Sequence, residues 1–562
     1  MATIASGPGN QAPPLEGYDL YGENRPLVEA VAREGAGWAG EALRGLGELL
    51  GGEPLEWGRL ANEHPPQLRT HDRFGNRIDE VEFHPAWHRL LGLGVEHALH
   101  AAPWREPRAG VHVARAAGFL TLAQVEAGVC CPLSMTFASL ATLREEPELY
   151  DEWKPALTST VYHPGLRPVT EKAGALCGMS LTERQGGSDV RANETVARPS
   201  ADGGEATLRG DKWFCSAPMC DAFLVTAHAP GGLTCYLVPR VLSDGERNAF
   251  HIDRLKDKLG NRSNASAEIR LDGAWARRVG EEGRGVRTII EMVAHTRLDC
   301  VLGSTGLMRR AVAEATHHAA HRAAFGRLLT EQPLMQNVLA DLCLDSEAAT
   351  VLAMRLARAY DEQDAPFRRL ATAVAKYWVC KSTPPLVAEA LECLGGNGYV
   401  EESVLPRLYR ESPLNSVWEG AGNVRARRPP RRRPPARKPR RAARRDRPRR
   451  RRGRPPRRRR RRPPPRARRP RRRRATRAPA RRTARPLPPG LAARPPRRRG
   501  RRRRVLRHPP RRRRRPRLRH APGRALACCD RRAAPAPRLG TSATRRRARR
   551  RGRSPRRDAR AA

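Results

Sequence analysis

The composition of the chain changes abruptly after Val424, and this change limits where a folded core can form. Residues 425–562 contain 64 Arg and 25 Pro among 138 residues. Arg is rarely buried without a partner, and Pro interrupts helices and sheets. Residues 425–562 therefore cannot bury a core, and we expect them to be disordered. The folded part of the 562-residue chain is expected within residues 1–424.

The net charge divides at the same point. Residues 425–562 carry +62, which leaves −10 for residues 1–424 out of the total of +52. Two explanations of the basic segment remain open. It could be an arginine-rich arm, whose binding to polyanions would be salt-sensitive and independent of sequence. It could equally be a frameshift, because a GC-rich gene read out of frame yields mostly Arg, Pro, Ala and Gly. The change falls inside a motif that should continue, and this favours the frameshift.

The remaining composition indicates a soluble protein of a reducing compartment. The twelve cysteines occur as singles and two adjacent pairs, without the C-x-x-C spacing of zinc sites. The N-terminus lacks the basic and apolar regions of a secretory signal. No apolar run approaches the ~18 residues that a membrane-spanning helix needs. We expect a cytoplasmic protein with free thiols, no metal site and no membrane partner.

Hydrophobic periodicity predicts an α+β fold that is mainly α. Residues 1–16 are rich in Gly and Pro and are expected to be flexible, and residues 17–178 show a mostly helical pattern. Residues 179–280 predict a small antiparallel β domain, and residues 281–424 a helical bundle.

Short segments of alternating polarity support the β domain. They are residues 206–217, 221–229, 233–240 and 265–274. The Pro-Gly-Gly sequence at 230–232 predicts a hairpin turn between two of them. The bundle is supported by apolar residues that step by three, four or seven along one predicted helix face: Leu334, Val338, Leu342, Ala349, Leu352 and Leu356.

Two motifs of the β region could bind a ligand. The stretch M-S-L-T-E-R-Q-G-G-S-D at 179–189 could form a tight loop whose amides face an anion, with the hydroxyls of Thr182 and Ser188 as further donors. The simpler alternative is a surface turn. Trp213 and Phe214 precede Ser216 on a predicted strand and could form an aromatic wall, although aromatic residues in strands are usually core.

Three motifs of the bundle have the same ambiguity. Arg322 and Phe325 are predicted to share a helix face, where the guanidinium could bind a diphosphate or be solvated. The glycines in G-G-N-G at 395–398 could end a helix or admit a ligand. Glu419 precedes a glycine, and its carboxylate could act as a general base if Trp418 raises its pKa, or be an ordinary surface group.

The order of these motifs, from about residue 80 to Val424, resembles the acyl-CoA dehydrogenase family. The match is closest to its AidB-like adaptive-response flavoproteins and there reaches back to about residue 10. It rests on long strings, which are G-Y-D-L-Y-G, R-E-G-A-G-W-A, T-H-D-R-F-G-N-R-I-D-E-V-E-F-H-P-A-W-H, P-M-C-D-A-F-L-V, H-T-R-L-D-C-V-L-G-S-T-G-L-M-R-R-A and P-R-L-Y-R-E. The resemblance implies the fold of that family and a bound FAD.

The resemblance also implies which segments hold the flavin. The isoalloxazine would lie against Met179, Leu181, Thr182, Gly187 and Ser188, with Phe214, Cys215 and Ser216 on its other side. Arg322 and Phe325 would reach FAD of a neighbouring subunit, which implies a homo-oligomer, namely a tetramer. The remaining cofactor residues would be Gly395, Gly396, Trp418, Gly420 and Asn423. Glu392 stands where the family usually has glutamine, and a carboxylate there would disfavour a nearby pyrophosphate.

The reaction implied is α,β-dehydrogenation of an acyl-CoA. Glu419 would remove the α-proton while a hydride passes from the β-carbon to the flavin. Some subfamilies carry this base just before the arginine at Arg297, but here that position is Thr296. An alternative is a DNA-binding protein of the alkylation-damage response with vestigial dehydrogenase activity. The family's helical domain for double-stranded DNA is expected to be replaced by the Arg/Pro tail. A truncated, inactive product is a third possibility.

Overall fold

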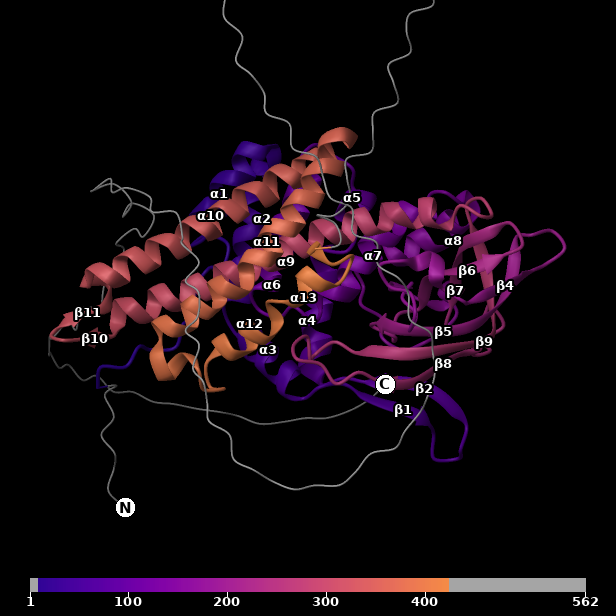
Figure 1. The fold of residues 1–562 in the computed structure, drawn as a ribbon, viewed down its shortest axis with the longest axis horizontal. Helices are drawn as coiled ribbons and strands as arrows, with labels where there is room; N and C mark the ends of the chain where they lie inside the picture. Colours follow the sequence, from indigo (N-terminus) through magenta and orange to yellow (C-terminus); the bar gives the residue numbers. More distant parts are fainter. Residues whose placement is uncertain (1–8, 424–562) are drawn as a thin grey trace, which may run out of the picture. The chain divides into compact units, whose positions relative to one another are not determined.

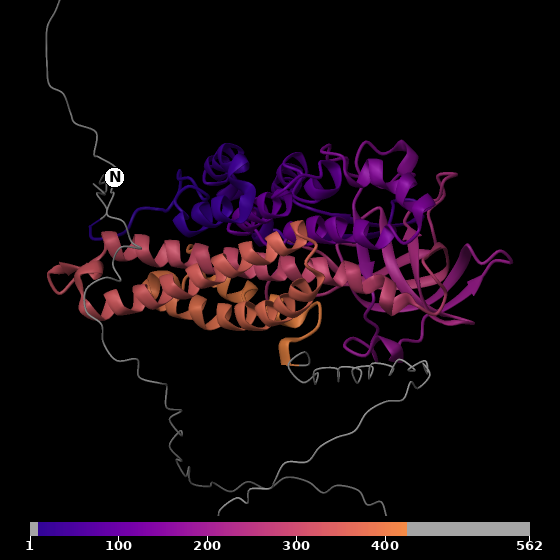
Figure 2. The ribbon, with the colours of Figure 1, turned by 90° about the horizontal axis from the view of Figure 1, so that it is seen from above.

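A computed structural model describes residues 9–423, which contain helical regions on both sides of a β domain in sequence (Figures 1 and 2). The α+β, mainly α fold class is confirmed. The predictions for residues 425–562 lie outside the described residues. Within the described part of the chain, no helix is both long enough and apolar enough to cross a bilayer.

The N-terminal region packs its helices around α6 and α7, in which nearly every residue is buried. Its elements are α1 (Arg25–Val31), η1 (Ala32–Ala36), η2 (Gly37–Ala39), α2 (Gly40–Leu50), α3 (Pro54–Glu63), α4 (Pro85–Glu96), α5 (Ala102–Arg105), α6 (Val111–Ala123), α7 (Cys130–Leu143), α8 (Pro147–Leu157) and η3 (Val169–Glu171). Helices α3, α4 and α8 begin at proline, where the missing N–H removes no helical bond. The Asp361 carboxylate of the later bundle accepts bonds from the N–H groups of His112 and Val113 at the start of α6, which ties the two regions together.

A β-hairpin interrupts the predicted helical region. It consists of β1 (Gln67–His71) and β2 (Arg77–Glu82), which pair antiparallel. The turn forms because the Asp72 carboxylate accepts N–H bonds from Phe74 and Asn76, at 2.8 and 2.9 Å. A local polar turn between alternating residues thus favours strands over a helix here.

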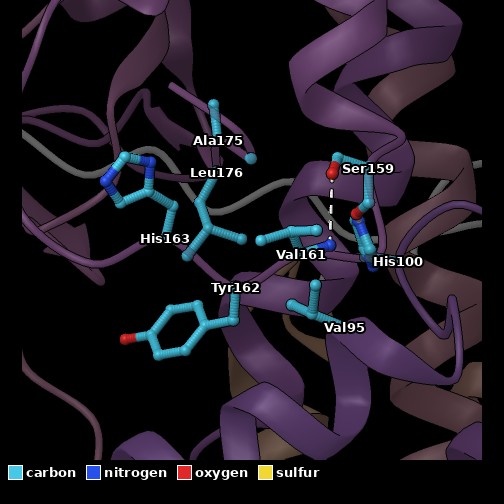
Figure 3. A pocket seen from close by; sticks show the side chains of 9 residues that line it. Val95, His100, Ser159, Val161, Tyr162, His163, Ala175 and Leu176 are labelled. Atoms are coloured by element: carbon cyan, nitrogen blue, oxygen red, sulfur yellow. Dashed lines mark hydrogen bonds between the residues drawn. The ribbon is translucent and has the colours of Figure 1, made fainter. Parts of the chain in front are cut away.

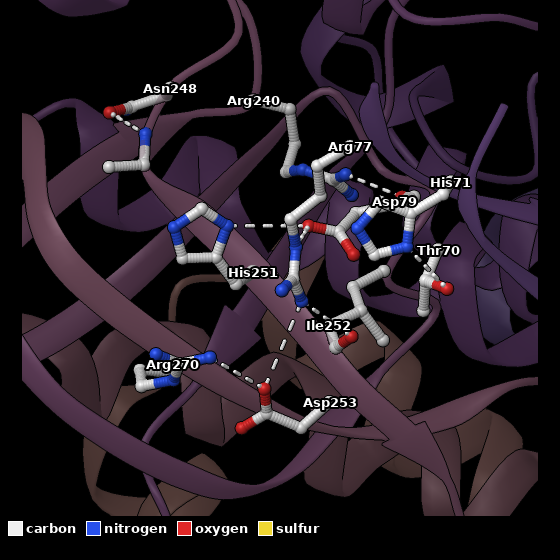
Figure 4. A network of polar contacts seen from close by, with 11 residues as sticks. Thr70, His71, Arg77, Asp79, Arg240, Asn248, His251, Ile252, Asp253 and Arg270 are labelled. Atoms are coloured by element: carbon white, nitrogen blue, oxygen red, sulfur yellow. Dashed lines mark hydrogen bonds and ion pairs between the residues drawn. The ribbon is translucent and has the colours of Figure 1, made fainter. Parts of the chain in front are cut away.

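Buried polar contacts fasten this hairpin to the β domain (Figure 4). Arg77 donates from Nε to the Asp79 carboxylate at 2.7 Å and from a terminal nitrogen to the Ile252 carbonyl at 3.2 Å. Arg240, which is buried, donates to the Asp79 carbonyl at 2.8 Å. The hairpin is therefore part of the β domain's surface in space, although it precedes that domain in sequence.

The β domain is a closed sheet. Its elements are β3 (Cys177–Ser180), η4 (Val190–Ala192), β4 (Val196–Pro199), β5 (Glu205–Ser216), β6 (Ala222–Ala229), β7 (Gly232–Pro239), β8 (Phe250–Leu255) and β9 (Ser266–Val279). The strand order is β3-β6-β4-β5-β9-β7, β8 pairs with β9, and an additional β6–β7 pairing closes the path into a barrel. Ala229 faces Gly232 across the predicted hairpin turn, which is confirmed. The sheet is not wholly antiparallel, because β3 and β4 run parallel to β6.

The C-terminal region is a bundle of long helices. Its elements are α9 (Gly285–His321), β10 (Ala323–Ala324), β11 (Arg327–Leu328), η5 (Leu329–Glu331), α10 (Pro333–Asp361), α11 (Ala365–Cys393), η6 (Gly395–Gly398), α12 (Val404–Glu411) and α13 (Leu414–Val417). Of the predicted stripe, Leu342, Ala349 and Leu356 are buried. The prediction is wrong for Leu334, which lies in the first turn of α10 and is 76% exposed.

The helical prediction for Arg322 and Phe325 is also wrong. Helix α9 ends at His321, and Arg322 follows in an extended conformation. Residues 323–328 form a two-stranded hairpin, which we call the Phe325 hairpin. Phe325 has φ 52° and Gly326 φ 76°, so the Phe-Gly pair makes a turn that a helix cannot contain.

Candidate functional site

Glu419 follows α13 in a strained conformation, and we call residues 415–420, which include the end of α13, the Glu419 turn. Its φ is 56°, and that of Gly420 is 93°. A positive φ at a residue other than glycine costs roughly 1–3 kcal/mol and persists only when the surroundings determine it. Neighbouring groups must therefore hold Glu419 in this conformation.

Helix α9 holds Glu419 through two successive residues. The Thr296 hydroxyl donates to Oε2 of Glu419 at 2.8 Å, and Arg297 Nε donates to the Glu419 carbonyl at 2.9 Å. Thr296 is buried. The two sequence positions that were considered for a base, 296 and 419, thus meet at one point.

The loop after β3 is fixed by the buried Glu183 carboxylate. It accepts bonds from Lys212 Nζ at 2.7 Å, from the Thr195 hydroxyl at 2.6 Å and from the Glu194 N–H at 2.6 Å. Burial alone would raise the pKa of Glu183, but Lys212 and the N–H and hydroxyl donors outweigh it and lower the pKa. Burial lowers the pKa of Lys212, and Glu183 opposes this effect. The pair anchors both ends of the loop that contains Gly187 and Ser188.

This loop lies against β5. The Trp213 N–H donates to the Thr182 carbonyl at 2.8 Å, which brings Met179, Leu181 and Thr182, all half-buried, beside the end of that strand. Gly187 and Ser188 are exposed. The first two predicted segments are therefore neighbours in space.

The residues at the end of β5 alternate between two faces. Phe214 is 52% exposed, Ser216 is half-buried, and Cys215 between them is fully buried. Burial raises the pKa of Cys215 to about 12, so its thiol stays protonated. Phe214 and Ser216 can face a ligand with their side chains, whereas Cys215 faces the core and offers only its backbone.

The β5 end lies against the start of α7. The Cys131 thiol lies beside Ser216 and Asn264, and burial raises its pKa to about 12, with Lys258 opposing and the Glu419 charge adding to the rise. Both side-chain amide atoms of Asn264 are buried and make no hydrogen bond to nitrogen or oxygen among the described residues, and the Cys131 thiol beside them is a weak partner. Buried polar groups are normally partnered, so these atoms mark a place for a polar ligand or water.

The Glu419 turn also brings its other predicted residues to the site. Trp418 is half-buried, and its indole N–H donates to Oδ1 of Asn415 at 2.8 Å. Gly420 is half-buried and Asn423 is exposed at the end of the described residues. These residues lie beside Glu419 by chain connectivity, as expected for one segment.

A second group of predicted residues lies elsewhere. Asn10 exchanges hydrogen bonds with Ala323 at 2.7 and 2.9 Å and accepts one from Arg322, while its neighbour Gln11 accepts from Asn397 at 2.9 Å. The N-terminal segment thus joins the Phe325 hairpin to the G-G-N-G turn, where Gly395 and Gly396 are exposed. Arg322 is 26 residues beyond Thr296, which corresponds to about 39 Å along α9.

A small, partly open pocket is lined by residues that belong to neither group (Figure 3). They include His100, Ser159 and Tyr162. His100 Nε2 is 3.0 Å from the Ser159 carbonyl, and burial lowers its pKa to about 4. Among the described residues, no group of three or more His, Cys, Asp or Glu could hold a metal ion.

Several residues of the site were not predicted from the sequence. Glu183 and Lys212 lie within the predicted segments 179–189 and 206–217 but were assigned no role, and Asn264 lies outside every predicted ligand-binding motif. Glu183 directly follows Thr182 and precedes two glycines, which is the only local signal that it could brace a loop.

Comparison with known families matches three successive parts of the chain. The AidB N-terminal domain of the adaptive response protein matches residues 10–164, the acyl-CoA dehydrogenase middle domain residues 178–274, and its C-terminal domain residues 283–432. The chain belongs to the acyl-CoA dehydrogenase family.

Individual proteins agree with this assignment. AidB of Escherichia coli (strain K12) is 50% identical over 422 residues, covering 74% of this chain and 78% of AidB. Acyl-CoA dehydrogenase family member 11 of Caenorhabditis elegans is 32% identical over 406 residues, covering 68% and 64%.

Solved structures share the fold. Caenorhabditis elegans ACDH-11 in complex with C11-CoA has a TM-score of 0.69 at 28% identity, covering 76% of this chain and 75% of that one. Butyryl-CoA dehydrogenase from Megasphaera elsdenii has a TM-score of 0.54 at 20% identity, covering 73% and 96%, and supports the fold alone.

Proposed function

We propose that the chain is an FAD-dependent, acyl-CoA dehydrogenase-like flavoprotein in which Glu419 removes a proton from the carbon next to a thioester carbonyl. The observation that carries the proposal is the Glu419 carboxylate, which the Thr296 hydroxyl of α9 holds in a strained turn. Family membership supports it, because the structures that share the fold include a complex with an acyl-CoA.

The residues present fit a flavin. The side-chain amide of Asn264 offers donors and an acceptor to a polar ring system. Phe214 offers an exposed aromatic surface that a bound ring would cover. The proposed binding residues are therefore the loop 179–188 and the β5 end, with Trp418 beside them. FAD bound there would supply the acceptor for a hydride from the substrate's β-carbon.

The chain's own residues would handle the proton. The Glu419 carboxylate takes the α-proton on one of its oxygens, and the Thr296 hydroxyl orients the carboxylate by donating to Oε2. Arg297 fixes the Glu419 backbone, so the carboxylate does not have to be ordered when substrate arrives. A preoriented base lowers the entropic part of the barrier.

A second copy of the chain would complete the cofactor site. Arg322 and Phe325 lie about 39 Å along α9 from Thr296, farther than one FAD extends. Phe325 is 99% exposed, as expected for a residue that meets another subunit. We therefore propose a homo-oligomer, with the tetramer as the expected form.

The test is flavin content together with substrate reduction. The purified full-length chain should contain flavin close to one per chain, and acyl-CoA thioesters of several lengths should bleach the flavin absorbance under anaerobic conditions. Protein without flavin after reconstitution with FAD would refute the proposal. Bound flavin that no acyl-CoA reduces would restrict the proposal to a flavoprotein without this reaction.

The family description "adaptive response protein AidB" supports a second candidate, a role in the response to DNA alkylation. In that case dehydrogenation would be vestigial and DNA would be the partner. Affinity for double-stranded DNA should be measured for the full chain and for a chain ending at Val424, at two salt concentrations. Binding that vanishes with residues 425–562 would exclude a DNA site in the body.

A further inference from the structure

Lys376 is a buried cation that contacts the Glu419 turn only through backbone oxygens. It lies in α11 and is 1% exposed. Its Nζ donates to the carbonyls of Asn415 at 3.0 Å, Trp418 at 2.8 Å and Gly420 at 3.2 Å. All three ammonium protons therefore have an acceptor, and all three acceptors belong to one short turn.

This arrangement fixes the backbone on both sides of Glu419. The Trp418 carbonyl belongs to the peptide plane before Glu419, and the Gly420 carbonyl to the second plane after it, and Lys376 holds both. The plane between them contains the Glu419 carbonyl, which Arg297 holds from α9. Because φ and ψ are rotations between successive peptide planes, fixing these planes determines the backbone angles at Glu419.

The direction of the Glu419 side chain follows from those angles. Residues other than glycine rarely adopt a φ of 56°. Without the hydrogen bonds from Lys376 and Arg297, the backbone of the turn would therefore relax. Relaxation would move the carboxylate away from the Thr296 hydroxyl, which donates to one of its oxygens. Lys376 thus acts on the carboxylate through the backbone, because its three hydrogen bonds end on carbonyl oxygens.

We propose that Lys376 is a positioning residue for the Glu419 base, and that α9 and α11 together hold the turn in its strained form. The inference rests on the proposed function of Glu419. It adds a residue that none of the sequence motifs contained. A purely structural lysine would stabilise the bundle in general, whereas a positioning lysine controls this turn.

The experiment compares Lys376→Met with Lys381→Met in the full-length flavoprotein. Methionine keeps the length of the side chain and removes the charge and all three donors. Lys381 is exposed on the same helix and serves as the matched control. The readouts are kcat and KM for an acyl-CoA, flavin content, and amide hydrogen exchange of residues 414–423 and of the rest of the chain.

In Lys376→Met, kcat should fall about 100-fold, because a catalytic group displaced by about 1 Å lowers the rate by about that factor. KM and flavin content should stay within about 2-fold of the unsubstituted protein. Amide exchange should accelerate about 10-fold or more in residues 414–423 and remain unchanged elsewhere. Lys381→Met should match the unsubstituted protein in kcat, KM and flavin content. Because the Lys381 side chain lies beside Gly422, exchange in this control is compared over residues 414–420, where it should be unchanged. If Lys376→Met does not fold, Lys376→Gln, which keeps two donors, should show the same local pattern with a smaller loss of kcat.

The proposal is overturned if kcat and the exchange of the turn are unchanged, or if flavin loss and faster exchange spread over the whole bundle. Glu419→Gln measured in parallel separates this failure from failure of the proposed function. If Glu419→Gln keeps full activity, Glu419 is not the base. If Glu419→Gln is inactive and Lys376→Met is normal, only the positioning role is wrong. The exchange measurement needs no turnover, so it shows whether Lys376 holds residues 414–423 even if no acyl-CoA reacts.

Discussion

The Glu419 turn and the Phe325 hairpin use the same backbone geometry in opposite surroundings. Glu419 and Phe325 have φ values of 56° and 52°, and each is followed by a glycine of positive φ. In the Glu419 turn, buried and half-buried side chains of two helices hold the backbone. In the Phe325 hairpin, the aromatic ring is 99% exposed.

This difference indicates where the support for each strained residue comes from. Strain persists where neighbouring groups determine the conformation. The Glu419 turn has these groups within one chain, so it can form in a monomer. The backbone of the Phe325 hairpin is held by Asn10, but its ring lacks cover, and under the proposed assembly the cover is a second copy. Under that proposal, one half of the site is built by folding and the other half by association of two copies.

The largest expected effect is the loss of kcat when the Glu419 carboxylate is removed, since the Phe325 hairpin carries no proposed base. Glu419→Gln should lower kcat about 1000-fold, within the range for loss of a general base, with flavin content unchanged. Anaerobic stopped-flow reduction by an acyl-CoA measures it. Glu402→Gln, the same change at an exposed position, should have no effect. A variant at Glu419 that keeps its reduction rate would remove the basis for treating this turn as catalytic.

Acidification should weaken the helical interior. His100 and His295 are buried and His112 is half-buried, and loss of hydration lowers their pKa values to about 4, 4 and 3, respectively. The unfolded chain binds these protons near pH 6.5 and the folded chain does not. Stability is therefore complete above pH 6.5 and falls as the pH drops, by about 2 kcal/mol per histidine at pH 5.

Urea unfolding at pH 7.5 and pH 5 measures this loss, and amide protection factors locate it. His295 directly precedes Thr296, so protection should fall more in the Glu419 turn than in the Phe325 hairpin. An equal fall in both regions would show that the two are not independently supported.

Removing one hydroxyl tests the contact between α9 and the carboxylate. Thr296→Val deletes the bond to Oε2 of Glu419 and should lower kcat about 10-fold, since a hydrogen bond to a charged group contributes about 1.5 kcal/mol. Steady-state kinetics with an acyl-CoA measure the change. Thr316→Val is the matched control, because that hydroxyl bonds only to carbonyls of its own helix among the contacts described. Equal losses in both variants would argue against a specific role of Thr296.

The smallest expected effect concerns the exposed ring. Phe325→Ala should leave the stability of the folded chain unchanged, because the ring has little contact to lose. It should weaken association or flavin retention about 5-fold, as truncation of an ordinary interface side chain does. Light scattering and flavin release on dilution measure the two quantities. A drop in stability with assembly and flavin unaffected would indicate that the hairpin serves only its own chain.

Local patterns in the sequence predicted much of the fold. Short segments bounded by turn residues located β5, β6, β7 and β9. Burial alternates along β5, as a period of two requires, whereas β6 and β7 are buried along nearly their whole length. The hairpin at residues 67–82 was missed, since its signal is an Asp-centred turn within a region of helical texture. Arg322 and Phe325 were predicted on a helix because their spacing fits one turn. The helix instead ends at His321, since Phe325 and Gly326 both have positive φ, and the glycine was the only sequence signal of this turn.

The site was predicted less completely than the fold. Glu419 was identified from its position before a glycine and from the family resemblance. Lys376, Glu183 and Lys212 were not, because a charged residue in a helix or strand looks like a solvent-facing one until its partners are known. Those partners are as much as 44 residues away in sequence, as for Lys376 and Gly420. Such contacts arise only from tertiary packing.

Because α9 is continuous, its length fixes both the distance from Thr296 to the Phe325 hairpin and the direction in which the hairpin points around the helix axis. Each residue of an α-helix adds about 1.5 Å and turns the chain by about 100°. One residue inserted between Thr296 and Arg322 would leave both ends locally intact, yet point the hairpin in a different direction around the axis. Two whole turns, or about seven residues, would restore the direction and displace the hairpin by about 10 Å. If neighbouring copies share a cofactor, the length of α9 is therefore as much a part of the cofactor site as any residue that touches it.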